Sequence, residues 1–321
     1  MRSSNGGCIL ENKDKELCER QYAESVKEKL RFFVIKELVN PIDDYQTISN
    51  WVDQFPENSV TPYFLLDTLI ILTRKQVEAS IRNIFEQIKA KIYVSNPNLS
   101  DEMLFAKYEE YLEKSVFISA CKPGQTAGGA PQTIHALRTV IEDKFDEISV
   151  PEVCQRITNG GIEHVYIVDD FIGTGNTICK ILKHEYLCDT CSCGQGIKKC
   201  SLQCAINHQT NVEFTVISVI LHKSGENLIK KCFKNVKILS AFTIDESYDL
   251  LSDTCELYRD ADYIEQIITE VRDIMDEHRM DENPYALHLP IGISGSFPNN
   301  SLELFWWSDS PEWKPLVRRL H

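Results

Sequence analysis

Two adjacent carboxylates, Asp169 and Asp170, stand between an apolar run and a glycine-rich turn in this chain. Carboxylate oxygens accept hydrogen bonds from sugar hydroxyls and are the ligands that Mg²⁺ prefers. The turn consists of Gly173, Thr174, Gly175, Asn176 and Thr177. Its glycines let the backbone approach an anion closely, and its hydroxyls can donate to a phosphate. Together these groups predict a ribose phosphate site, with the phosphate in the turn and the ribose hydroxyls or a hydrated metal at the carboxylates.

The segments on either side of these residues indicate how they are held. Residues 165–168 are apolar, mostly β-branched and uninterrupted, which is typical of a strand buried on both faces. The apolar residues from 178 to 182 predict a helix after the turn. A helix N-terminus offers free N–H groups and a positive dipole end, and open α/β sheets bind ligands beyond the carboxyl ends of their strands. The turn and the carboxylates are therefore expected at one edge of a sheet.

Three more familiar motifs fit this run less well. An ordinary strand-to-helix turn often contains glycine and threonine, but it gives no structural reason for two adjacent carboxylates. A Walker A loop requires a Gly-Lys-Ser/Thr ending that occurs nowhere in the chain. A dinucleotide fingerprint would need a third glycine at the position of Ile178.

Residues 165–177 resemble, without a gap, the signature of type I phosphoribosyltransferases: an apolar strand, an acidic pair, a small-residue spacer and Thr-Gly-x-Thr. The resemblance implies an α/β fold of that type, with a parallel sheet flanked by helices. It also implies that Asp169 and Asp170 bind the ribose 2- and 3-hydroxyls of phosphoribosyl pyrophosphate (PRPP). The turn would bind the 5-phosphate, and Mg²⁺ would accompany PRPP as cofactor.

A looser resemblance extends over most of the chain. The ending at residues 298–306 and 313–316, the segment at 51–55 and the signature occur in the same order as in phosphoribosyltransferase-like proteins of bacterial conflict and anti-phage systems. This similarity implies a role as an anti-phage effector. The cysteine-rich residues 188–204 are not part of the resemblance.

Lys122 follows a predicted strand at residues 116–120 and lies in a Pro-Gly loop. In type I phosphoribosyltransferases, a loop in this position binds the pyrophosphate of PRPP, so the resemblance implies that Lys122 neutralises the leaving group. The alternative is a solvated loop lysine. The glycine-containing residues 124–129 are expected to form either a phosphate-approach loop or a disordered lid. They do not match the usual pyrophosphate loop of the family, so the resemblance does not decide whether the protein is catalytic.

Five cysteines lie within seventeen residues: Cys188, Cys191, Cys193, Cys200 and Cys204. Zinc sites commonly use four tetrahedral ligands in two closely spaced pairs. Cys188 with Cys191 and Cys200 with Cys204 supply such pairs, which predicts a zinc site. Cys193 is left over, and His184 and His208 are nearby substitutes. A reduced, flexible insertion or a chance cluster of cysteines would account for the same residues.

The 321 residues divide into three expected parts. Residues 1–20 are polar and expected to be poorly ordered, residues 21–112 form a helical lobe, and residues 113–321 form the phosphoribosyltransferase-like domain with the cysteine insertion at 188–204. Within the lobe, residues 63–72 predict a buried helix and residues 75–92 an amphipathic one. Further strands are predicted at 212–221 and 236–242, with helices at 131–145, 228–233 and 263–275. The tryptophans of the tail are expected to pack in a core rather than to stack on a base.

Composition narrows the class of function. With 43% hydrophobic residues, the chain can bury a core. The net charge of −14 disfavours nucleic acid as a partner. The longest apolar run, residues 214–221, is too short to span a membrane, and the N-terminus lacks the apolar core of a signal peptide, which predicts a cytoplasmic protein.

Two functions from different classes are consistent with these residues. The first is an enzyme that binds Mg²⁺–PRPP and transfers or hydrolyses its phosphoribosyl group with release of pyrophosphate. The second is a non-catalytic protein that senses PRPP or a related nucleotide and passes the signal to a protein partner through the helical lobe or the cysteine insertion. Release of pyrophosphate from PRPP distinguishes the two.

Overall fold

The computed structural model describes residues 12–37, 42, 44–121, 129–141, 146–187, 199–208, 211–258, 264–293 and 296–318. The helices are α1 Asn12–Ile35, α2 Tyr45–Val52, α3 Thr61–Thr68, α4 Arg74–Val94, α5 Asp101–Glu113, α6 Gly129–Val140, α7 Val150–Thr158, α8 Asn176–Lys183, α9 Leu202–His208, α10 Lys223–Cys232 and α11 Ile264–Glu277. The strands are β1 Ile70–Leu72, β2 Ser115–Ser119, β3 Asp146–Glu147, β4 His164–Ile172, β5 Tyr186–Leu187, β6 Lys199–Cys200, β7 Glu213–His222, β8 Val236–Ile244 and β9 Ile291–Ile293. Short 3₁₀ turns lie at Glu246–Tyr248, Met280–Glu282 and Glu303–Phe305.

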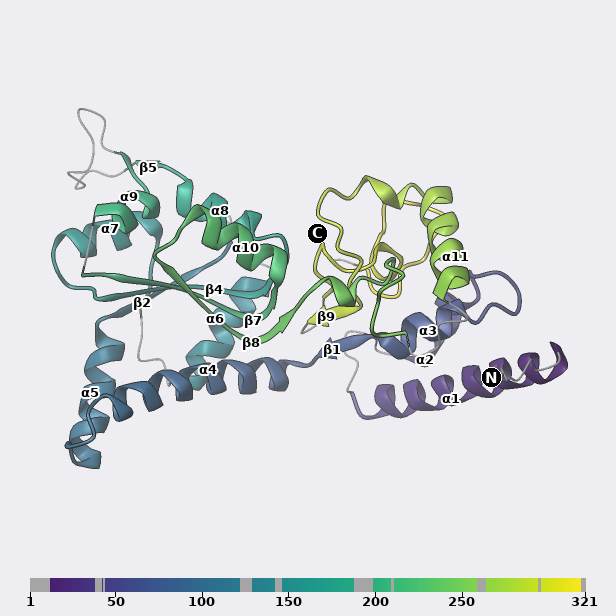
Figure 1. The fold of residues 1–321 in the computed structure, drawn as a ribbon, viewed down its shortest axis with the longest axis horizontal. Helices are drawn as coiled ribbons and strands as arrows, with labels where there is room; N and C mark the ends of the chain where they lie inside the picture. Colours follow the sequence, from purple (N-terminus) through teal and green to yellow (C-terminus); the bar gives the residue numbers. More distant parts are fainter. Residues whose placement is uncertain are drawn as a thin grey trace, which may run out of the picture.

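A parallel sheet with the strand order β3-β2-β4-β7-β8 forms the centre of one lobe (Figure 1). Numbered by appearance along the chain, this order is 2-1-3-4-5, so the direction of strand addition reverses between β2 and β4. Open α/β sheets bind ligands beyond the carboxyl ends of the strands at such a reversal. The predicted α/β class with a parallel sheet is confirmed.

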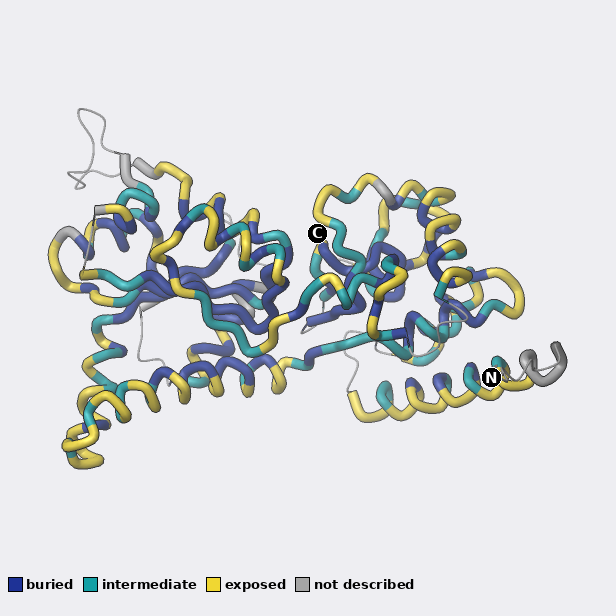
Figure 2. The backbone as a smooth tube through the Cα atoms, in the orientation of Figure 1, coloured by how far each residue is buried: buried dark blue, intermediate teal, exposed yellow. Residues whose placement is uncertain are grey.

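Helices cover both faces of this sheet. Val165 and Ile167 of β4 belong to the apolar cluster that contains α7, α8, α9 and α10. Tyr166 and Val168, which point to the opposite face, belong to the cluster that contains α4 and α6. Figure 2 shows the central strands as a buried layer between exposed helix surfaces. The uninterrupted apolar sequence of β4 follows from this burial on both faces.

A second apolar core, here called the terminal core, joins the two ends of the chain. It is built from α1, α2, α3 and α11 together with the irregular residues 250–258 and 297–316. The indole nitrogens of Trp51 and Trp313 both donate to the carbonyl oxygen of Leu304, at 2.8 and 3.1 Å. Figure 1 shows these segments gathered beside the sheet lobe. Trp306 and Trp313 are buried in this core, as expected of packing residues.

The packing divides the expected helical lobe at residues 21–112. Helices α1–α3 belong to the terminal core, whereas α4 packs against the sheet. Helical periodicity shows that a helix has a buried face but does not show which element covers it. The helix predicted at residues 63–72 is also wrong at its end: α3 stops at Thr68, and residues 70–72 form β1, which pairs in parallel with β9.

The first residues of the chain also differ in part from the expectation. Residues 12–20, predicted to be poorly ordered, belong to α1, and residues 1–11 lie outside the described residues. Among the helices described here, none is long and apolar enough to cross a membrane.

Candidate functional site

Glycines shape the turn between β4 and α8. Gly175 has φ +76°, a conformation that side chains rarely adopt, and it precedes the first residue of α8. A Cβ atom at Gly175 would lie 2.8 Å from the carbonyl oxygen of Gly225 in α10. A Cβ at Gly225 would lie only 2.4 Å from the carbonyl oxygen of Gly173. Helix α10 therefore packs directly on the backbone of the turn and fixes its shape.

The start of α8 provides an anion-binding surface. The first intrahelical hydrogen bond runs from the N–H of Cys179 to the carbonyl of Gly175 at 3.0 Å, so the N–H groups of residues 176–178 precede the helical ladder. Gly175 has no side chain with which to cap them. Asn176 donates its amide to the hydroxyl oxygen of Thr174 at 3.1 Å. All these residues line a cavity of about 790 Å³, in which the helix dipole favours a negative charge.

The acidic pair stands at the end of β4 beside this turn. Asp169 is buried and lines the cavity, and its carboxylate accepts a hydrogen bond of 3.0 Å from the N–H of Asp170. Burial, and next the charge of Asp170, raise the pKa of Asp169 well above its usual value. Burial also raises the pKa of Asp170, against the opposing effect of Asp169. Ionising both groups is therefore costly without a cation or hydroxyl donors.

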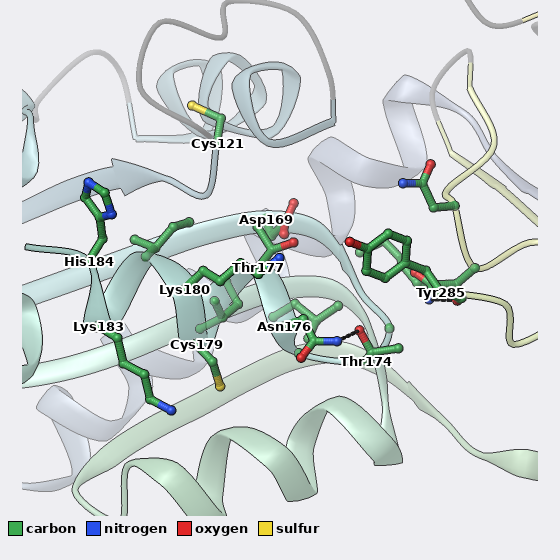
Figure 3. A pocket seen from close by; sticks show the side chains of 18 residues that line it. Cys121, Asp169, Thr174, Asn176, Thr177, Cys179, Lys180, Lys183, His184 and Tyr285 are labelled. Carbon is green, nitrogen blue, oxygen red and sulfur yellow. Dashed lines mark hydrogen bonds between the residues drawn. The ribbon is translucent and has the colours of Figure 1, made fainter. Parts of the chain in front are cut away.

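The terminal segment supplies the opposite wall of the cavity. The side chain of Asn300 occupies the space beside Gly173, where a Cβ atom would lie 2.4 Å from its Cγ. Its amide donates to the carbonyl of Tyr285 at 2.5 Å. In Figure 3, the ring of Tyr285 lies across from Thr174 and Asn176. The sequence carried no signal for Tyr285. The resemblance of the tail pointed to the region of Asn300 but assigned it no role.

The structure brings together much of the predicted site. Asp169 and the turn residues Gly173, Thr174, Gly175, Asn176 and Thr177 line one cavity. Asp170 is half-buried and is not among the described residues that line it. Lys122 lies outside the described residues, but Cys121, which immediately precedes it, lines the cavity. The loop after β2 therefore begins at the same cavity.

The described residues include two of the four predicted zinc ligands, Cys200 and Cys204. Cys188, Cys191 and Cys193 lie outside the described residues. Cys200 is in β6, which pairs antiparallel with β5, and Cys204 is in α9. Within the described ranges there is no group of three or more His, Cys, Asp or Glu side chains suited to a metal. Zinc at this insertion remains a prediction.

Comparison with known proteins bears on the identity of the site. The family model PRTase-CE matches residues 48–319. No curated protein matches the chain. Among solved structures, the chain is similar to the orotate phosphoribosyltransferase from Aeropyrum pernix, at 15% sequence identity and a TM-score of 0.23, over 44% of this chain and 72% of that one. That structural likeness carries no argument, whereas the family match includes the whole sheet core and most of the terminal core.

Proposed function

The chain belongs to the PRTase-CE family of phosphoribosyltransferase-like proteins, and from this membership we propose that the cavity binds Mg²⁺–PRPP. The protein would transfer the phosphoribosyl group to a nitrogen nucleophile or to water, with release of pyrophosphate. One observation supports this most directly. A single cavity at the reversal of the strand order unites the Asp169 carboxyl group with the uncapped start of α8.

The turn would hold the 5-phosphate of the ligand. Phosphate oxygens can accept hydrogen bonds from the N–H groups of residues 176–178 and from the hydroxyls of Thr174 and Thr177. The fixed packing of α10 on Gly173 and Gly175 means that little order has to be gained when the anion binds. This preorganisation would let an acidic protein bind an anionic ligand locally.

Asp169 and Asp170 would accept hydrogen bonds from the ribose hydroxyls. Burial raises the pKa values of both groups, so a bound cation would favour their ionised forms, and carboxylate oxygens suit Mg²⁺. The residues therefore fit the metal. When bound, Mg²⁺ would offset the charge of the pyrophosphate leaving group.

In the proposed reaction, the bond between C1 of the ribose and the pyrophosphate oxygen breaks, and a bond from C1 to the acceptor nitrogen or to water forms. The acceptor loses one proton. Positive charge develops on the ribose in the transition state, and the carboxylates beside the ribose would stabilise it. The bound 5-phosphate would hold the ribose so that C1 faces the acceptor atom. Lys122 is proposed to neutralise pyrophosphate as it leaves.

A second function is favoured by the contact between Asn300 and Gly173. This contact joins the phosphate turn to the segment that leads into the terminal core. A ligand in the turn could therefore change the terminal core without reacting, as expected of a PRPP sensor with a protein partner. Measurement of pyrophosphate after incubation with Mg²⁺ and PRPP separates the two functions, because a sensor binds PRPP without releasing pyrophosphate.

Titration calorimetry with Mg²⁺ and PRPP tests the proposed site. Asp169→Asn combined with Asp170→Asn should weaken binding by at least about 100-fold, equivalent to about 2.7 kcal/mol. Asp273→Asn with Asp276→Asn is a matched control, since it removes two exposed carboxylates from α11 and should leave binding unchanged. Wild-type affinity in the first double variant would overturn the assignment. The anti-phage role is proposed from the tail resemblance, and plaque counts on cells expressing the same two variants would test it.

A further inference from the structure

The two helices that shape the phosphate turn each carry a cysteine that packs in the same apolar cluster. Cys179, in the first half of α8, is buried and lines the ligand cavity. Cys232 is the last residue of α10 and is half-buried. Cys179 belongs to one apolar cluster, against which Cys232 packs. After burial, the neighbouring Cys232 is the next cause that raises the pKa of Cys179. Lys183 follows Cys179 by one helical turn in α8. The ammonium group of Lys183 lies 3.7 Å from the sulfur of Cys232 and donates to it.

We propose that Cys179 and Cys232 are a dithiol–disulfide site that responds to low-molecular-weight disulfides and changes the affinity of the phosphate turn. The two helices that carry the thiols are also the two that shape the turn. Helix α8 begins with its anion-binding N–H groups, and α10 packs on the turn through Gly225. The existence of the disulfide does not depend on the proposed function, whereas its effect on ligand binding rests on it.

The chemistry can proceed by two thiol–disulfide exchanges. Cys232, the more exposed sulfur, attacks one sulfur of oxidised glutathione as its thiolate, and one glutathione leaves with the proton. Cys179 then attacks the sulfur of Cys232 in the mixed disulfide, and its proton leaves with the second glutathione. One disulfide is gained by the protein and one is lost by glutathione. Burial raises the pKa of the Cys179 thiol to about 11, which makes Cys179 the second rather than the first to react.

Closing the bond would strain the turn. A disulfide requires the two sulfurs about 2.05 Å apart and constrains the spacing of the two backbones, so it would fix the end of α10 against α8. Gly225 already touches the backbone of Gly173 too closely to admit even a Cβ atom, so α10 cannot approach without displacing the turn. We therefore expect the oxidised protein to bind ribose 5-phosphate at least about fivefold more weakly than the reduced protein, at the low end of typical coupling between sites.

The test uses the full chain, oxidised glutathione and thiol trapping under denaturing conditions. Trypsin cleaves after Arg156, Lys180, Lys231 and Lys234, which places each thiol in its own peptide. We expect the peptide 157–180 to be linked to 232–234 in the wild type and in Cys18→Ser, an exposed-cysteine control, but not in Cys232→Ser. Calorimetry with ribose 5-phosphate then compares the reduced and oxidised proteins.

Each result bears on a different part of the proposal. Alkylation of both cysteines to the same extent as buried Cys154, or a glutathione adduct that persists on Cys232, would overturn the disulfide site. A linked peptide without loss of ribose 5-phosphate affinity would overturn its control of the turn. If reduced protein binds no ribose 5-phosphate at all, the proposed function fails, and the linked peptide still decides whether the disulfide site exists.

Discussion

The sheet core and the terminal core bury apolar side chains by different means. In the sheet core, neighbouring strands pair along their backbones, and β-branched residues fill both faces. In the terminal core, an irregular tail needs side-chain donors for its carbonyls, and Leu304 receives two indole N–H groups. The backbone of the phosphate turn comes from β4 and α8, and α10 of the sheet core packs on it. The anion-binding N–H groups therefore come from the sheet core, and the terminal core adds the opposite wall of the cavity through Asn300.

The largest loss of stability should come from removing a large buried side chain from the terminal core. Trp51→Ala removes a fully buried side chain and should lower the free energy of unfolding by about 3–5 kcal/mol. Denaturant unfolding followed by circular dichroism measures this loss. Trp51→Phe should cost less, because Trp313 still donates to the Leu304 carbonyl. Under conditions where Trp51→Ala remains folded, ribose 5-phosphate affinity should be retained. Its loss in step with stability would mean that the two cores act as one unit.

A smaller effect is expected inside the sheet core. Gly225→Ala places a Cβ atom 2.4 Å from a backbone oxygen that cannot rotate away, so α10 must shift. Overpacking of this kind costs about 1–3 kcal/mol. Because α10 shapes the turn, ribose 5-phosphate affinity should fall as well. Gly161→Ala is the control, since its nearest contact is a backbone oxygen at 4.0 Å. Equal behaviour of the two variants in thermal unfolding and calorimetry would contradict the proposed support of the turn.

Disturbing the contact between the phosphate turn and the terminal core should have a smaller effect on stability. Gly173→Ala brings a Cβ atom against the side chain of Asn300, which can move. We expect a loss of about 1 kcal/mol in unfolding free energy, and a double variant with Asn300→Ala should show less than the sum of the single losses. Strict additivity in this cycle would show that the wall and the turn do not interact.

The smallest expected effect concerns how the stability of the folded protein depends on pH through Asp169 and Asp170. Because both aspartate pKa values are raised above 3.8, the folded protein binds more protons than the unfolded chain between that value and the raised values. Stability of the ligand-free protein should therefore fall as the pH rises through this window and then level off. Asp169→Asn with Asp170→Asn should flatten this part of the curve. Thermal unfolding from pH 4 upward, compared with Asp273→Asn plus Asp276→Asn, measures the difference; two parallel curves would contradict it.

The sequence predicted the elements whose structure depends on residues close to them in the chain. The buried strand at residues 165–168, the turn and the start of α8 were all expected, because their periodicity and glycine pattern depend on adjacent elements. A short helix was predicted at 228–233, whereas α10 in the structure begins earlier, at Lys223, and includes Gly225. A glycine normally weakens a helix, and only its contact with the turn explains its place there.

The terminal core could not be predicted in the same way. The apolar residues 70–72 suit a helix or a strand, and β1 is decided by pairing with β9 at residues 291–293. Tyr285 and Asn300 reach the cavity through contacts that no local pattern encodes. Helix α5 lies almost entirely within the expected helical lobe, but neither its bounds nor α7 were predicted, although Ser100 caps α5 with its side chain. Local rules locate such a cap only when the surrounding periodicity is strong.

The hydrogen bond from Trp51 to Leu304 has a consequence for biosynthesis, since it spans 253 residues. At typical ribosomal speeds, the second half of the terminal core emerges roughly 10–50 s after the first. The strands of the sheet emerge within that interval and can pair on their own. Nascent α1–α3 must meanwhile expose Trp51 and Leu65 to solvent or to chaperones. Translation that stops between residues 293 and 304 would therefore release a chain that contains the whole sheet core, while the apolar faces of α1–α3 remain exposed.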